Sequence, residues 1–433
     1  MLTKARLLTL FLLIALTFAL TGCSDDDDPT NPMSTAKTFT VTIENVSEAY
    51  DYFGSGVFNT PVGASAPAAI GAGGAYEVRF GAGPGHRLSF ATMLVQSNDL
   101  FYAPGGAGLD LYPGGTALSG DITNQIMLWD AGTEANEMPG TGPNQAPRQA
   151  GPNTGPADSD NTVRLVNDSF MYPVTAGVVE VMLTAHGEGE FTLRVENVST
   201  DQIMAPGVFV VHSGGNPIFT AGMANVGEGL ENLAEDGDPS VLAGALDGRT
   251  GLTVPMTPGV FVVHSSGQPL FASGMPNGGS GLEGLAEDGD PSGLTASVSG
   301  SGTFTTPMGA AGPGPLLPGH SYQFTVTAEP GDRLSLATMF VESNDVFFGF
   351  GDTGLALFDG SGTATSGDVS AQVMLWDAGT EANQWPGLGS SQPLRQGGAN
   401  SGAADGNNIV RLVNDGFSYP AVNDVIRVSL MVQ

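Results

Sequence analysis

Acidic side chains occur twice in this chain within the same sequence context. Residues 129–136 (WDAGTEAN) recur letter for letter at 376–383, and RLSFATMLVQSND at 87–99 returns as RLSLATMFVESND at 333–345. The best-matched segments of both copies carry carboxylates and glycine at the ends of candidate strands. Oxygen ligands of this kind suit calcium, which accepts flexible sets, whereas magnesium demands stricter octahedral geometry. The pattern therefore predicts a hard-cation site in each copy, with turn capping by the same acids as the alternative.

The copied segments keep their order and spacing. RLVND at 164–168 returns at 411–415, so the offsets between the copies are 246 or 247 residues along the whole match. Residues 39–46 and 191–198 alternate apolar and polar side chains, the period of a half-buried strand. Other short candidate strands are bounded by Gly, Pro, Asn or Asp. We therefore expect an all-β protein of two tandem antiparallel β-sandwich domains, at 38–188 and 189–433.

The second copy contains a further duplication near its start. Residues 206–240 recur at 258–292. Leu230, Leu233 and Ala234 are spaced three and four apart, which predicts a short helix in each duplicated segment, ending before Gly237. We expect only 258–292 to join the core of the second sandwich, with 206–240 as an added layer. Deletion of about 204–255 should then leave a folded domain.

The N-terminus has the features of an export signal. Lys4 and Arg6 precede an apolar run at 7–20 that is too short to span a bilayer comfortably, and the run ends in LTGC with Cys23, the only cysteine. This resembles a bacterial lipoprotein signal at 1–22, cleaved before a lipidated Cys23; an ordinary secretory signal is the alternative. An acidic tether follows at 23–37. The expected location is the bacterial outer membrane or cell surface, with the lipid anchor as the only membrane contact.

The composition excludes several classes of function. A formal net charge of −31 provides no electrostatic footprint for DNA or RNA and favours cations or basic partners. A single cysteine excludes a disulfide framework and any multi-cysteine metal site. The sequence also lacks the Gly-x-Ser-x-Gly elbow, a phosphate-cradling loop and the His-Glu-x-x-His motif, so we do not expect an enzyme.

Three other residue types could do chemistry, and each has a structural alternative. His212 and His264 follow equivalent Val-Phe-Val-Val runs, where we expect structural histidines at strand ends. Trp129 and Trp376 precede the acidic octapeptide residues, and we expect them to pack beneath the loop, with sugar stacking as the alternative. Residues 235–238 and 287–290 (EDGD) lack the full ligand ladder of a calcium loop and are interpreted as helix ends.

Three segments together resemble a known family. EGLAEDG at 283–289, LATMFVESND at 336–345 and DAGTE at 377–381 are similar, in that order, to the spondin N-terminal domain, whose animal members are F-spondin and mindin. The resemblance covers most of 190–433, while 39–185 matches only the later part of the domain. It implies a C2-like, spondin-type β-sandwich with a bound calcium ion and a role in matrix and cell adhesion.

The resemblance also implies a set of calcium ligands. They are the Asp of the Ser-x-Asp turn and both acids of the Asp-Ala-Gly-Thr-Asp motif, where this chain has Glu as the last residue. The matching positions are Asp99, Asp130 and Glu134 in the first copy and Asp345, Asp377 and Glu381 in the second. The predicted function is a lipid-anchored, calcium-binding surface protein that contacts an extracellular protein or polysaccharide. The alternative is a secreted carbohydrate-active enzyme using paired carboxylates.

Overall fold

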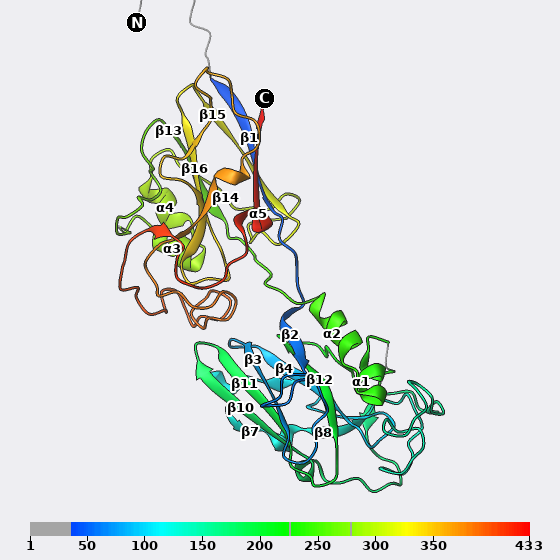
Figure 1. Ribbon diagram of the computed structural model, residues 1–433. Coiled ribbons are helices and arrows are strands. Elements are labelled where there is room, and N and C mark those ends of the chain that lie inside the picture. The colour runs from blue at the N-terminus through cyan, green and yellow to red at the C-terminus, as the bar shows by residue number, and fades with distance from the viewer. Residues whose placement is uncertain (1–35, 225–226, 278) are drawn as a thin grey trace, which may run out of the picture. The chain divides into compact units, whose positions relative to one another are not determined.

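The computed structural model describes residues 36–224, 227–277 and 279–433, and antiparallel strands dominate them (Figure 1). The strands form two β-sandwiches, each with its own hydrophobic core. The all-β sandwich fold is therefore confirmed. The expected signal peptide, Cys23 and nearly all of the tether lie outside the described residues. Among the residues that are described, no helix is long and apolar enough to cross a membrane.

Sandwich 1 consists of strands β2 to β12. Its smaller sheet has the order β3 (Ala75–Gly81), β11 (Glu190–Asn197), β10 (Val179–Gly187), β7 (Gly120–Asp121). Its larger sheet has the order β2 (Tyr52–Phe58), β12 (Met204–His212), β4 (Arg87–Leu94), β5 (Leu100–Ala103), β8 (Met127–Asp130), β9 (Arg164–Leu165), with β6 (Leu109–Asp110) beside β4. Tyr76 and Phe191 from the first sheet pack with Phe90 and Phe209 from the second to form the core.

Sandwich 2 repeats this arrangement with strands from both ends of the chain. Its smaller sheet has the order β15 (Ser321–Ala328), β1 (Lys37–Asn45), β22 (Ile426–Val432), β19 (Gly367–Asp368). Its larger sheet has the order β14 (Gly302–Phe304), β13 (Gly259–His264), β16 (Arg333–Met339), β17 (Val346–Phe350), β20 (Val373–Asp377), β21 (Arg411–Leu412), with β18 (Leu355–Ala356) beside β16. Phe39, Val41 and Ile43 of β1 alternate into the core, as their period-2 spacing predicts.

The strand pairing corrects the expected domain ranges of 38–188 and 189–433. The first strand, β1, pairs with β15 and β22, so that Val41 lies opposite Phe324 and Leu430. In turn, β11 pairs with β3 and β10 in sandwich 1. Sandwich 1 is thus continuous over 52–247, and it is inserted in the sequence between β1 and β13 of sandwich 2. Because β1 and β11 share the same alternation of apolar and polar residues, their local pattern does not determine which sandwich each strand joins.

The duplicated segments are distributed one to each sandwich, which corrects the expected added layer at 206–240. The first contains β12, α1 (Leu230–Asp236) and α2 (Ser240–Asp247), and the second contains β13, α3 (Leu282–Asp288) and α4 (Ser292–Ser297). Deletion of about 204–255 would remove β12, which lies between β2 and β4. The predicted helices are present, each followed by a glycine with positive φ. The helices α2, α4 and α5 (Val422–Val425) were not expected.

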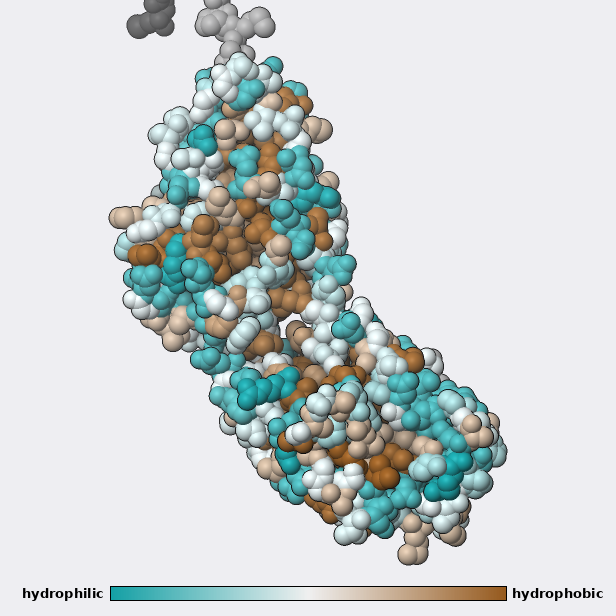
Figure 2. Space-filling model, viewed as in Figure 1, coloured by the Kyte–Doolittle hydropathy of each residue, from teal (hydrophilic) through white to brown (hydrophobic). Residues whose placement is uncertain are grey.

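Helices α1 and α2 cover the outer face of the larger sheet of sandwich 1, and α3 and α4 cover that of sandwich 2. In sandwich 2, Leu282 and Leu285 of α3 pack with Phe347 and Trp376 in a cluster separate from the core between the sheets. An equivalent cluster joins α1 and α2 to sandwich 1. Figure 2 shows hydrophilic and hydrophobic residues interspersed on the visible surface. Each of these two helix pairs therefore encloses a second apolar layer, and the acidic motifs lie at the edge of that layer.

Candidate functional site

Asp345 lies fully buried in the turn between β16 and β17. Its Oδ2 accepts hydrogen bonds from the backbone N–H of Thr380 at 2.7 Å and of Glu381 at 3.0 Å, and from the Thr380 hydroxyl at 3.1 Å. Its Oδ1 has no hydrogen-bond partner among the described residues. A buried carboxylate oxygen without a donor is costly, so this oxygen is a candidate ligand atom.

Asp377, by contrast, has donors on both oxygens. It is the last residue of β20, and its Oδ1 accepts from the backbone N–H of Gly379 at 2.7 Å. Its Oδ2 accepts from the Asn383 side chain at 2.9 Å and from the Arg411 guanidinium at 2.7 Å. This is the turn-capping geometry that was the alternative for these acids. Asp377 nevertheless lies close enough to Asp345 for its charge to act on that carboxyl.

Glu381 is also held by the protein. Its Oε1 accepts from the backbone N–H of Gly402 at 2.6 Å, and its Oε2 accepts from the Asn344 side chain at 3.3 Å. The carboxylate lies so close to the Cα of Gly402 that a Cβ added at that position would overlap it. A side chain at position 402 would therefore force the Glu381 carboxylate to move. Throughout the described ranges, no group of three or more His, Cys, Asp or Glu side chains is arranged to hold a metal ion. Asp345, Asp377 and Glu381 are thus neighbours whose carboxylates do not converge on one point.

A fourth carboxylate reaches this site from the helix that covers it. Glu287 of α3 is buried, and neither of its carboxyl oxygens has a hydrogen-bond partner in the described part of the chain. Burial raises its pKa to about 7, the nearby Thr380 hydroxyl opposes that rise, and the charges of Glu381 and Asp345 add to it. A cavity of about 240 Å³ is lined in part by Glu287 and by Glu283 at the start of the helix. The cavity therefore adjoins the buried Glu287.

Glu287 was not among the predicted site residues. The predicted end of the helix is correct, since α3 ends at Asp288 and Gly289 follows with φ of 70°. The helical period gave no signal, because Leu282, Leu285 and Ala286 define the apolar stripe and Glu287 lies outside it. The usable signal was the recurrence of the same acid at Glu235 in the other duplicated segment.

The charges of the site oppose ionisation of its carboxyls. Burial first, and then the charge of Asp377, raise the pKa of Asp345 to about 7 despite the amide donors on its Oδ2. Burial raises the pKa of Asp377 to about 6, although Arg411 opposes the rise. Arg411 is shared with Asp405, so the site has more carboxylates than cations. At neutral pH a divalent cation would compete with protons for Asp345 and Glu287.

Sandwich 1 contains the same site. Asp99 is fully buried, its Oδ2 accepts from the backbone N–H of Thr133 at 2.7 Å, and its Oδ1 has no partner within the described residues. Burial raises the pKa of Asp99 to about 7 and that of Glu235, on α1, to about 8. Asp130 accepts a hydrogen bond from the Arg164 guanidinium at 2.8 Å, and Glu134 accepts one from the backbone N–H of Gly155 at 2.5 Å. The two copies therefore keep the same arrangement of free and engaged oxygens.

The histidines connect strands. His264 Nδ1 lies 3.2 Å from the carbonyl of Ser266 and must carry the proton to donate to it, so Nε2 accepts from the Ser335 hydroxyl at 2.8 Å. His212 makes the equivalent contact with Ser89 at 3.0 Å. The serines lie in strands β4 and β16, and both are buried. The structural role expected of these histidines agrees with this geometry.

The tryptophans that precede the acidic residues are buried beneath the site. Trp376 donates from Nε1 to the carbonyl of Gly349 at 3.3 Å, and its ring centroid lies 4.9 Å from that of Phe271. The ring centroid of Trp129 likewise lies 4.8 Å from that of Phe219. These rings support the loop, as expected, and do not offer a face to a sugar.

Comparison with known protein families and with curated proteins finds no match for this chain in either.

Proposed function

We propose that the protein is a calcium-stabilised surface module, held at the cell surface by a lipid on Cys23, that contacts an extracellular protein or polysaccharide. The observation that carries the proposal is the pair of free carboxylates in each sandwich. Asp345 Oδ1 and both oxygens of Glu287 are buried without a donor in the described chain, and Asp99 and Glu235 repeat the pattern. Oxygen atoms from flexible carboxylates are the ligands that calcium prefers.

Such an ion would require the carboxylates to move from the positions that they occupy in the structure, because they do not converge on one point among the described residues. Asp345 and Glu287 would contribute their free oxygens, while Asp377 is close enough to share its charge. Glu381 would have to turn from Gly402 to become a ligand, so we assign it a positioning role in the absence of calcium. A bound calcium ion would neutralise a cluster that otherwise repels itself. It would thereby join the helix α3 to the loops at the end of the larger sheet.

The surface role is supported by separate features. The charge of −31 keeps the chain away from nucleic acids and anionic surfaces. The resemblance of 283–289, 336–345 and 377–381 to the spondin N-terminal domain implies matrix or cell adhesion. The LTGC motif at 20–23 supports the lipid anchor. Asp345 is fully buried, which gives no support to polymer hydrolysis by paired carboxylates at this site.

The metal part of the proposal is tested by measuring bound metal and thermal stability together. The full chain, purified without chelator, should contain calcium by elemental analysis, and its unfolding temperature should fall when EDTA is added. Magnesium at the same concentration should restore less stability than calcium. Identical unfolding in calcium and EDTA, with no metal in the purified chain, would refute the calcium site.

A further inference from the structure

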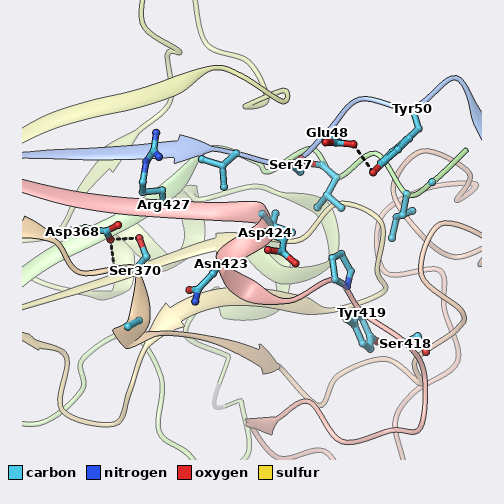
Figure 3. Close-up of a pocket in the computed structure, with 17 residues that line it drawn as sticks. Ser47, Glu48, Tyr50, Asp368, Ser370, Ser418, Tyr419, Asn423, Asp424 and Arg427 are labelled. Carbon is cyan, nitrogen blue, oxygen red and sulfur yellow. Dashed lines mark hydrogen bonds between the residues drawn. The ribbon is translucent and has the colours of Figure 1, made fainter. Parts of the chain in front are cut away.

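A cavity on sandwich 2 has a volume of about 1020 Å³ (Figure 3). Its walls come from the segment after β1, which includes Glu48 and Tyr50, and from the region around α5, which includes Tyr419, Asn423 and Asp424. These segments are fixed by backbone contacts. The N–H of Val46 donates to the carbonyl of Val425 at 2.8 Å, and the N–H of Tyr50 donates to Thr253 Oγ1 at 2.7 Å.

The internal repeat provides a comparison for this cavity. The scaffold residues Asp368 and Tyr419 have the same residue types in sandwich 1, at Asp121 and Tyr172. The side chains that line the opening differ. Sandwich 2 has Glu48, Tyr50, Asn423, Asp424 and Arg427 where sandwich 1 has Thr200, Gln202, Ala176, Gly177 and Glu180. The two copies therefore share a fold at this place. Sandwich 2 differs by an additional aromatic ring at Tyr50 and by polar side chains at Asn423 and Asp424, where sandwich 1 has only Ala176 and Gly177.

The polar groups of the cavity are available for a ligand. The side chains of Asn423 and Asp424 are exposed, and no hydrogen bond to either is recorded in the described residues. The Tyr50 hydroxyl donates to Glu48 at 2.8 Å, and the Tyr419 hydroxyl donates to Asp415 at 2.8 Å. Both phenol rings are thereby held at the cavity by their polar ends. Aromatic rings beside amide and carboxylate groups are suited to the faces and hydroxyl groups of a sugar.

The charge of the cavity restricts the class of sugar. Glu48, Asp368 and Asp424 are acidic, and the Arg427 guanidinium is already paired with Glu44. This balance repels sulfated, phosphorylated or uronic-acid polymers. We propose that the cavity binds an uncharged oligosaccharide through Asn423, Asp424 and the rings of Tyr50 and Tyr419. This assignment gives the proposed surface function a class of ligand. It rests on that function, because the protein would encounter the sugar at the cell surface.

The test uses the full chain and isothermal titration with cellohexaose, xylohexaose and chitohexaose, with a heparin hexasaccharide and hexalysine as contrasting probes. At least one neutral hexasaccharide should bind, and the double variant Asn423→Ala/Asp424→Ala should lower that affinity at least about tenfold. The matched control is Thr200→Ala, at the exposed position of sandwich 1 that corresponds to Glu48. It should leave binding unchanged.

Three results would overturn the saccharide assignment. The first is that no neutral hexasaccharide binds, and the second is that the double variant binds the saccharide as tightly as the unmutated chain does. The third is that the double variant weakens the binding of hexalysine and of no other probe. Repeating the titration in EDTA and with Asp345→Asn separates this assignment from the calcium site. Saccharide binding that persists in a chain whose stability does not respond to calcium supports the cavity assignment and refutes only the metal site.

Discussion

Replacing Asp345 by asparagine should affect stability in opposite directions with and without calcium. The carboxyl has a pKa of about 7 in the folded chain against an ordinary value of 3.8, so ionising it at pH 8 costs the native state about 4 kcal/mol. An asparagine side chain at this position would keep an oxygen to accept from the N–H of Thr380 without adding a charge. In EDTA at pH 8, Asp345→Asn should therefore raise the unfolding free energy of sandwich 2, with about 4 kcal/mol as the upper bound.

The pH dependence provides a second test of the same reasoning. A carboxyl whose pKa is raised by folding holds its proton more tightly in the native state, so the contribution of Asp345 to metal-free stability is greatest at low pH and falls as the pH rises from about 4 to about 7. The gain from Asp345→Asn in EDTA should accordingly shrink to below about 2 kcal/mol at pH 5. Calcium should stabilise the unmutated chain by about 2.7 kcal/mol at a hundredfold excess over the dissociation constant. The variant should lose this gain in sandwich 2 and keep it in sandwich 1, where Asp99 is unchanged.

Differential scanning calorimetry in EDTA and in calcium, at pH 5 and pH 8, measures all of these quantities. The exposed Asp352→Asn serves as the control for a change of charge outside the site and should behave like the unmutated chain. Asp99→Asn should reproduce the effect in sandwich 1, because Asp99 has the same free Oδ1. A variant Asp345→Asn that is less stable than the unmutated chain in EDTA at pH 8, or that retains the calcium gain in sandwich 2, would refute the reasoning.

Three further predictions concern the anchor, the support of the site and the exchange of strands. Cys23→Ala should release the protein from the membrane fraction of the producing cell, and unchanged fractionation would refute lipidation. Gly402→Ala should destabilise sandwich 2 by about 1–3 kcal/mol in denaturant unfolding, because a Cβ there would displace the buried Glu381 carboxylate from its hydrogen bond with the Gly402 N–H, whereas Gly406→Ala, with open space around it, should not. Phe39→Ala should lower the unfolding free energy of sandwich 2 by about 3–5 kcal/mol, and Phe191→Ala should lower that of sandwich 1 by the same amount. In calorimetry, each variant should lower the unfolding temperature of a different transition.

Much of the fold could be predicted from the sequence because its signals are local. The alternation of Phe39, Val41 and Ile43 predicts a strand with one buried face, and the structure buries all three. The three- and four-residue spacing of Leu230, Leu233 and Ala234 predicts the helix that is found at α1. The repeat itself indicates two copies of one folding unit. Each of these inferences needs only the residues within one element or a comparison of the chain with itself.

The candidate site could be predicted only in part. The recurrence of WDAGTEAN and of the Ser-Asn-Asp turn correctly brought Asp345, Asp377 and Glu381 into one neighbourhood. The sequence did not show that Arg411 and Gly402 engage two of these carboxylates, because the donors lie 34 and 21 residues farther along the chain. It also did not show that a glutamate from the covering helix faces the site.

The division of strands between the sandwiches was decided by tertiary structure alone. The segments FTVTIEN at 39–45 and FTLRVEN at 191–197 carry the same alternation, so either could fill the equivalent slot of either sandwich. Their pairing depends on partners far away in the chain, with Val41 opposite Leu430 and Phe191 opposite Phe80. The sequence by itself determined what each segment forms, through the period of its side chains. Only long-range packing, which must close both cores at once, determined which sandwich each segment joins and which carboxylates are left without a donor.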